Sequence, residues 1–204
     1  MTGNEVVHVV DDDVDVRKSL GFLLATADFA VRLHESATAF LATATKDIEG
    51  CILTDVRMPG IDGIEFLRQL RARGQTVPVI VMTGHADVAL AVQAMKEGAA
   101  DFIEKPFDDQ ILIDAIRLAL DNRSHSTVAH PQASEIHKSL STLSERERQV
   151  LDGLVSGLPN KTIAYDLGIS PRTVEIHRAN VMSKMRAGSL SHLVRMALIA
   201  DSNH

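Results

Sequence analysis

Apolar positions in residues 1–121 fall into short continuous runs that are separated by longer amphipathic stretches. Such runs, for example Val79–Met82, are typical of strands buried on both faces of a parallel sheet. The expected strands are Val6–Val10, Ala30–Leu33, Cys51–Thr54, Val79–Met82 and Phe102–Glu104. The expected helices are Val14–Ala27, Ala37–Thr43, Gly63–Arg73, Val88–Glu97 and Asp108–Asp121. This alternation predicts an α/β domain with a doubly wound, five-stranded parallel sheet.

The pattern changes at residues 122–134 (NRSHSTVAHPQAS), which carry no apolar period and include a proline, so we expect a linker there. Beyond it the periodicity is helical. Ser144 and Glu147 predict a capping box, because hydroxyl and carboxylate can satisfy each other's exposed amides. Later helices are expected at Lys161–Leu167, Pro171–Met185 and Leu190–Ala200, with a break at Gly168–Ser170. The chain therefore divides into an α/β domain (1–121), a linker (122–134) and an all-α, four-helix domain (135–204).

Composition excludes several classes of protein. Hydrophobic residues make up 45% of the chain and charged residues 24%, which is ordinary globular usage. No basic, apolar leader and no run near the ~18 apolar residues of a membrane span is present, so we expect a cytoplasmic protein with no membrane contact. The single cysteine, Cys51, excludes an internal disulfide and is expected to be a buried core residue.

The net charge of −6 is distributed unevenly. Residues 1–123 contain 12 basic and 20 acidic residues, a net charge of −8, whereas residues 124–204 contain 9 basic and 7 acidic residues, a net charge of +2. A polyanion such as nucleic acid is therefore expected to bind only the C-terminal part, through a local basic patch.

Chemically active side chains follow the expected strands. Asp11 and Asp12 follow the first strand, Asp55 the third, Thr83 the fourth and Lys105 the fifth. In a doubly wound sheet the carboxyl ends of the strands meet at one edge, where such folds place their chemistry. Three carboxylates there repel each other unless a cation offsets their charge. The sequence therefore predicts a site for a hard divalent cation.

Oxygen ligands alone favour Mg2+, which accepts one or two carboxylates, water and a carbonyl oxygen. Asp12, Asp55 and the main-chain oxygen of Arg57 can supply such a set. With the metal reducing the charge, the Asp55 carboxylate can act as a nucleophile and form an aspartyl-phosphate. Thr83 and Lys105 are then placed to contact phosphoryl oxygens.

Four segments carry a resemblance to the receiver domains of response regulators, and the resemblance covers roughly residues 5–122. They are DDD at 11–13, DVRMPGIDG at 55–63, MTGHAD at 82–87 and DFIEKPF at 101–107. The resemblance implies that Asp55 is the phosphoacceptor, that Asp11 and Asp12 bind the metal, and that Phe102 is an aromatic switch residue. It also implies a cis Lys105–Pro106 bond. Receivers of this kind act on no outside substrate and catalyse only their own Mg2+-dependent phosphorylation and dephosphorylation.

A helical wheel of the stretch from Pro171 to Met185 separates a core face from an outer face. Val174, Val181 and Met185 fall on the core face, and Arg172, Glu175, Ile176, Ala179 and Ser183 on the opposite one. Glu175 can accept a hydrogen bond from cytosine and Ile176 can contact a thymine methyl. The expected DNA-binding residues are Lys161, Thr162, Arg172, Thr173, Glu175, Ile176, Arg178, Ala179 and Lys184. Lys161, Arg172, Thr173 and Lys184 are expected to contact phosphate. Arg178, close to the core face, is expected to form an internal ion pair or to reach round to phosphate.

The sequence SPRTVEIHRANVMSKM is similar to the recognition helix of LuxR-type helix-turn-helix domains. A receiver joined to this domain resembles the NarL/FixJ group of response regulators, in particular its nitrogen-fixation transcriptional activators. That resemblance implies phosphorylation by a sensor histidine kinase, of the oxygen-sensing FixL type, and a homodimer of the phosphorylated protein. It further implies binding to double-stranded promoter DNA and activation of RNA polymerase at nitrogen-fixation or microaerobic genes.

Two other classes were weighed against this interpretation. A phosphatase of the haloacid dehalogenase type also uses an aspartate nucleophile and Mg2+, but it requires Thr or Val at the fourth place after the nucleophile, where Asp11 is followed by Asp15. A flavodoxin-like binder requires a phosphate loop after the first strand, and three aspartates there would repel phosphate. A binding module that does not contact DNA stays open from the sequence.

Overall fold

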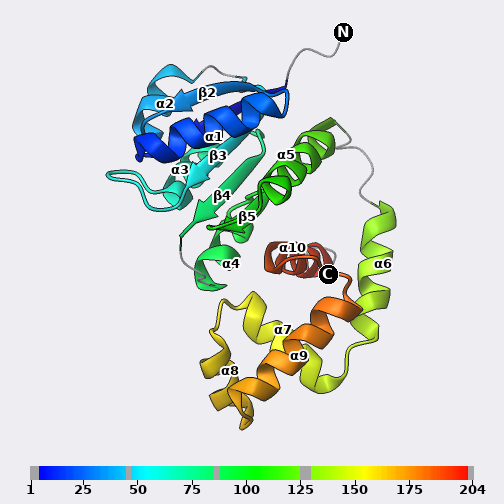
Figure 1. The fold of residues 1–204 in the computed structure, drawn as a ribbon. Coiled ribbons are helices and arrows are strands. Elements are labelled where there is room, and N and C mark those ends of the chain that lie inside the picture. The colour runs from blue at the N-terminus through cyan, green and yellow to red at the C-terminus, as the bar shows by residue number, and fades with distance from the viewer. Residues whose placement is uncertain (1–4, 45–46, 85–87, 125–129, 202–204) are drawn as a thin grey trace. The chain divides into compact units, whose positions relative to one another are not determined.

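The computed structural model describes residues 5–44, 47–84, 88–124 and 130–201 (Figure 1). The chain divides into two compact units, one of residues 1–86 and 97–126 and the other of residues 87–96 and 127–204. Helix α4 (Val88–Lys96) is thus grouped with the second unit, although the predicted boundary placed it in the first. The predicted fold class is confirmed, whereas the domain limits stay a prediction.

The first unit contains one parallel sheet with the strand order β2-β1-β3-β4-β5 (Figure 1). Its strands are β1 (Val6–Val10), β2 (Ala30–His34), β3 (Cys51–Asp55), β4 (Val79–Thr83) and β5 (Asp101–Glu104). Its helices are α1 (Val14–Thr26), α2 (Ala37–Thr43), α3 (Gly63–Ala72) and α5 (Asp109–Ser124). The order reverses between β1 and β3, and this switch point is where open α/β sheets place their sites.

One face of the sheet packs against α1 and α5. Val7 and Val9 of β1 share a buried apolar cluster with Leu20 of α1 and Ile116 of α5. The buried thiol of Cys51 belongs to this cluster, as predicted, and burial raises its pKa to about 12. The thiol is therefore a core side chain and not a nucleophile.

The opposite face carries an aromatic cluster. Because side chains alternate along a strand, His8 points away from Val7 and Val9. Its ring stacks on His34 of β2, with 5.4 Å between ring centres, and meets Phe40 of α2 edge-on. Phe40 in turn packs edge-on against Phe66 of α3. His8 Nδ1 and His34 Nε2 lie 3.2 Å apart, so the pair shares a hydrogen bond when both rings are neutral.

Five helices lie within the described residues 130–201. They are α6 (His130–Ser141), α7 (Glu145–Val155), α8 (Asn160–Leu167), α9 (Pro171–Lys184) and α10 (Leu190–Asp201). Val150 and Leu154 of α7, Ile163 of α8 and Val174 and Val181 of α9 are buried in one core. The predicted capping box is present, with Ser144 and Glu147 bonded reciprocally at the start of α7. Among the described residues, no helix is long and apolar enough to cross a membrane.

Helix structure extends into both ends of the segment predicted as a linker. Helix α5 continues to Ser124, and α6 begins at His130, while residues 125–129 lie outside the described part. Pro131 is compatible with a first helical turn, where its missing N–H would have had no partner. Ile136 of α6 is buried in the core of α7 to α10. Helix α6 therefore packs as part of the helical unit.

We predict that the buried His8 makes the stability of the sheet pH-dependent. Burial, the nearby His34 and the charge of Arg32 lower the pKa of His8 from 6.5 to about 4. Below pH 6.5 the unfolded chain therefore binds a proton that the folded chain does not. The stabilisation is complete above pH 6.5 and is lost as the pH falls towards 4, by on the order of 2 kcal/mol.

Scanning calorimetry of the wild type and of His8→Leu at about pH 7 and about pH 4.5 measures this effect. The wild type should lose more stability on acidification than His8→Leu does, whereas His137→Leu, at an exposed position of α6, should behave as the wild type. An equal loss in all three proteins would show that His8 is not responsible.

Candidate functional site

Two carboxylates and one ammonium group meet at the carboxyl edge of the sheet. Asp11 directly follows β1, Asp55 ends β3 and Lys105 directly follows β5. Lys105 Nζ donates to Asp55 Oδ1 at 2.6 Å and to Asp11 Oδ2 at 3.0 Å. The strand order brings these residues together, because β3 lies between β1 and β4 and β5 lies beside β4. The fold thus brings three of the predicted site residues, Asp11, Asp55 and Lys105, together from distant segments.

Backbone groups hold the two carboxylates in place. The Arg57 N–H donates to Asp55 Oδ2 at 2.6 Å, and the Asp13 N–H donates to Asp11 Oδ1 at 2.9 Å. The Arg17 guanidinium of α1 donates to the Asp11 carbonyl oxygen at 2.6 Å. Both oxygens of each carboxylate are therefore engaged, and neither side chain can rotate without losing a hydrogen bond.

The charges at this edge stabilise one another. Burial alone would lower the pKa of Lys105, but the hydrogen bonds from its ammonium to Asp55 and Asp11 outweigh burial and raise it. Asp11 is buried, and the Asp55 side chain is 13% exposed. The lysine stays charged, and the Asp55 side chain keeps a small exposed surface.

The predicted three-carboxylate cluster is formed only in part. Asp12 is exposed, and within residues 5–44, 47–84, 88–124 and 130–201 no three acidic, histidine or cysteine side chains are gathered as metal ligands. The ammonium of Lys105 bonds to both Asp11 and Asp55 and offsets the repulsion between these two carboxylates.

The other predicted receiver residues lie close by in the fold. Thr83 ends β4 and is buried, and its carbonyl oxygen accepts from the Lys105 N–H at 2.6 Å. Phe102 lies on β5 and is half-buried. The Lys105–Pro106 bond is cis, as predicted. Residues 85–87, which complete the motif after Thr83, lie outside the described residues.

Two neighbours of the site have structural roles. Asp13 caps α1 by accepting from the N–H groups of Val16 and Asp15, and these bonds lower its pKa. Gly63, the first residue of α3, lies directly against the backbone of Asp55. A Cβ at position 63 would lie only 2.2 Å from the Asp55 carbonyl oxygen. Neither Gly63 nor Arg17 was predicted as a site residue. For Gly63 a signal existed, since the motif DVRMPGIDG ends on it.

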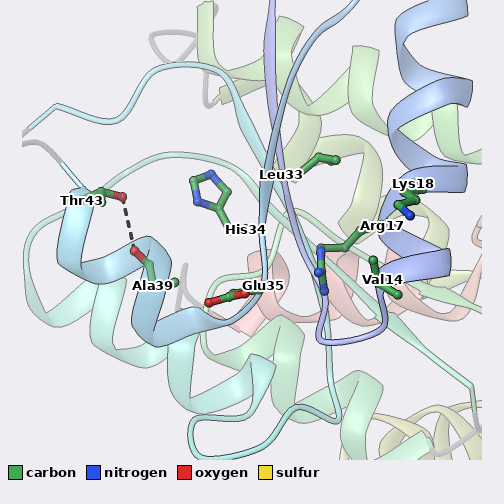
Figure 2. Close-up of a pocket in the computed structure, with 8 residues that line it drawn as sticks. All are labelled: Val14, Arg17, Lys18, Leu33, His34, Glu35, Ala39 and Thr43. Carbon is green, nitrogen blue, oxygen red and sulfur yellow. Dashed lines mark hydrogen bonds between the residues drawn. The ribbon is translucent and has the colours of Figure 1, made fainter.

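A cavity of about 500 Å³ opens beside this site (Figure 2). Its walls come from the start of α1, the end of β2 and α2, and include Arg17, His34 and Glu35. Asp55 and Lys105 do not line it. The Asp11, Asp55 and Lys105 side chains therefore meet at the edge of the sheet and do not line this cavity.

The second unit presents a helix-turn-helix. Gly168 ends α8 in a left-handed conformation (φ 65°), which only glycine adopts without strain, and Ser170 caps α9. On α9, Arg172, Glu175 and Ala179 are exposed, and 54% of Ile176 is exposed. Lys161 and Thr162 are exposed on the first turn of α8, and Thr173 is half-buried. The outer face predicted from the wheel is thus the solvent face of α9.

Arg178 and Lys184, two basic residues predicted to bind DNA, differ in their contacts within the protein. Arg178 is half-buried, and its expected internal ion pair is absent among the described residues. Lys184 donates to Glu147 Oε2 at 2.6 Å and to the Thr142 carbonyl oxygen at 3.2 Å. Glu147 was predicted only as part of a capping box. Its ion pair with Lys184 was not predicted, because the two residues are far apart in the sequence.

Family models match both parts of the chain. The model of the response regulator receiver domain matches residues 7–117, and that of bacterial regulatory proteins of the luxR family matches residues 141–197. The chain belongs to the response regulators. The receiver match spans the first unit together with α4, and the luxR-family match lies in the C-terminal helices.

Similar proteins cover this response regulator over nearly its whole length. The transcriptional regulatory protein FixJ of Azorhizobium caulinodans is 60% identical over 95% of this chain and 92% of its own length. FixJ of Rhizobium meliloti is 57% identical over 94% of both chains. The crystal structure of full-length FixJ from B. japonicum, 48% identical, covers 98% of this chain and 99% of its own, with a TM-score of 0.57.

We predict that Gly63→Ala disturbs the site of this response regulator. The new methyl group cannot coexist with the Asp55 carbonyl oxygen at 2.2 Å, so β3 or α3 must shift. The expected loss of stability is about 1–3 kcal/mol, with slower phosphorylation by acetyl phosphate. Urea unfolding and phosphorylation kinetics measure the two effects. Gly188→Ala, where a Cβ would contact nothing, is the matched control; equal behaviour of both variants would contradict the steric explanation.

Proposed function

We propose that this response regulator accepts a phosphoryl group on Asp55 from a sensor histidine kinase and, once phosphorylated, binds promoter DNA and activates transcription. The observation that carries the proposal is the placement of the Lys105 ammonium 2.6 Å from Asp55 Oδ1, at the sheet edge where backbone amides hold both carboxylates. The helix-turn-helix in the same chain supplies the DNA-binding output.

In the proposed reaction Asp55 Oδ1 attacks the phosphorus atom of the donor. The new O–P bond forms as the bond from phosphorus to the donor's leaving group breaks, and the leaving group departs with the electron pair. Lys105 releases Oδ1 and its ammonium follows the transferred phosphoryl oxygens. The Arg57 N–H keeps the other carboxylate oxygen in place. Thr83 contacts the phosphoryl group and Phe102 moves with it as the switch.

Mg2+ is proposed as the resident cation. The donor set fits such an ion. Asp11 and Asp55 already lie around one positive charge, the Lys105 ammonium, and the exposed Asp12 and the main-chain oxygen of Arg57 are further oxygen donors. When bound, the ion would offset the negative charge of the phosphoryl group. We propose that the protein catalyses only its own phosphorylation and dephosphorylation.

For the output, we propose that α9 enters the major groove. Glu175, Ile176 and Ala179 would approach base edges, and Lys161, Thr162, Arg172 and Thr173 would contact the backbone. Arg178 joins the backbone contacts, because a half-buried guanidinium that forms no ion pair within the described residues gains a charged partner from a phosphate oxygen. The proposed homodimer would place two recognition helices one DNA turn apart.

The proposed biological setting rests on the relatives. Three of them carry the name transcriptional regulatory protein FixJ. By that similarity, and the resemblance stated from the motifs, the donor is a FixL-type oxygen-sensing kinase, the target genes serve nitrogen fixation or microaerobic growth, and the bound dimer recruits RNA polymerase. A protein that binds the bacterial chromosome acts in the cytoplasm.

The proposed phosphoacceptor is tested with Asp55→Asn. The carboxamide cannot form an acyl phosphate, so acetyl phosphate with Mg2+ should add one phosphoryl group to the wild type and none to the variant. Intact-mass spectrometry reads out the adduct. Asp62→Asn, which removes a carboxylate that caps α3, should still be phosphorylated. An adduct that persists in Asp55→Asn would move the phosphoacceptor elsewhere.

The proposed DNA contacts predict a steep dependence on salt. Each phosphate that a Lys or Arg neutralises releases a counterion, so log affinity should fall with log salt with a slope of about −0.9 per contact. Duplexes selected by the phosphorylated protein from a random library serve as the probe, in fluorescence anisotropy. Arg172→Met should reduce the slope by about one unit. A slope near zero in the wild type would exclude the proposed basic contacts.

A further inference from the structure

Lys184 was expected to contact DNA phosphate, but its ammonium is engaged inside the protein. It lies on the last turn of α9 and donates to Glu147 Oε2 at 2.6 Å and to the Thr142 carbonyl oxygen at 3.2 Å. Both acceptors belong to the turn and first helical residues that begin α7. The recognition helix is therefore tied at its C-terminal end to the start of another helix.

Glu147 is also held by hydrogen bonds to Ser144, independently of the lysine. Its Oε2 accepts from the Ser144 N–H at 2.8 Å, and its own N–H donates to Ser144 Oγ at 3.3 Å. The residue is buried, with 4% exposed, whereas the Lys184 side chain is 39% exposed. The hydrogen bond from Lys184, followed by that from Ser144, lowers the pKa of Glu147 to about 2. A buried carboxylate that is ionised at every physiological pH needs its cation close by.

The other end of α9 is fixed by different means. Gly168 turns the chain between α8 and α9, and Ser170 accepts from the Thr173 N–H at 3.1 Å to cap α9. Val174 in the first half of α9, and Val181 and Met185 at its C-terminal end, are buried in the core. Apolar packing is non-directional, so the charged hydrogen bond of Lys184 adds the directional contact at that end.

We propose that Lys184 is a positioning residue of the recognition helix, which acts through Glu147 to set the direction in which Ile176 and its neighbours meet the base edges. This positioning role rests on the proposed DNA-binding function and refines that function. The consequence concerns specificity: a helix free to tilt at its C-terminal end keeps its phosphate contacts, which tolerate small shifts, but loses base contacts, which do not.

The test measures the affinity of the full-length chain, treated with acetyl phosphate and Mg2+, for two DNA probes. One is the duplex selected by the wild type and the other is a random-sequence duplex of the same length. Lys184→Met should weaken binding to the selected duplex about tenfold, the loss of one hydrogen bond to a charged group, while the random duplex changes less than about twofold. The salt slope should stay unchanged.

A double-mutant cycle with Glu147→Gln shows whether Lys184 acts through Glu147. Glutamine still accepts from the Ser144 N–H and so preserves the capping box, but it removes the charge. Adding Lys184→Met to Glu147→Gln should then cost little further specificity. Lys184→Arg, which keeps charge and donors, should retain most of the wild-type preference. Arg148→Met removes a different α7 cation, one that donates to the Leu140 carbonyl oxygen, and should leave the preference intact.

Each other outcome overturns the inference. If Lys184 contacts phosphate, both probes weaken together in Lys184→Met, the salt slope falls by about 0.9, and the loss persists in the Glu147→Gln background. If its role is only to stabilise the fold, the melting temperature falls while both affinities stay unchanged. If Lys184→Met does not fold, Glu147→Gln alone must lower the ratio of the two affinities and Lys184→Arg must keep it. A wild type that binds neither probe overturns the proposed function itself.

Discussion

The hydrogen bond between Lys105 and Asp55 joins residues that are 50 positions apart in the chain, and the bond to Asp11 spans 94 positions. Two carboxylates at one sheet edge repel each other, and the ammonium between them makes their approach favourable. This arrangement requires β1, β3 and β5 to end at the same level. It also requires α3 to begin directly against Asp55, which only a glycine at position 63 permits. The reactive edge is therefore built as one unit with the packing of the sheet.

A second ion pair performs a different task in the helical unit. Lys105 joins two carboxylates at the edge of the sheet, whereas Lys184 joins the end of α9 to Glu147 at the start of α7. The first pair exchanges partners during the proposed reaction, because the ammonium must leave Asp55 for the phosphoryl group. In the second pair the acid is buried and is also held by the Ser144 N–H, and the lysine also donates to the Thr142 carbonyl oxygen. A lysine–carboxylate ion pair thus takes part in the proposed phosphoryl transfer in one unit and in the proposed orientation of α9 in the other.

The sequence predicted most of what depends on local pattern. Strand ends at Asp55, Thr83 and Lys105, the capping box at Ser144 and the outer face of α9 follow from periodicity and residue type, and the structure agrees with them. What it did not predict depends on which distant groups meet. Lys184 resembles any basic residue on a DNA-binding helix until Glu147 is placed beside it. Likewise, the expected Arg178 ion pair needed an acid that the fold does not supply within the described residues.

The buried thiol of Cys51 has a practical consequence. The chain contains one cysteine and no tryptophan, and that cysteine is held protonated in the core of the sheet. Thiol-directed reagents should therefore not modify the native protein, since the thiolate is the reactive form. A cysteine or tryptophan introduced on α9 or near Asp55 would report from a single known position. The two halves of the regulator can thus be followed by separate spectroscopic labels without first removing native residues.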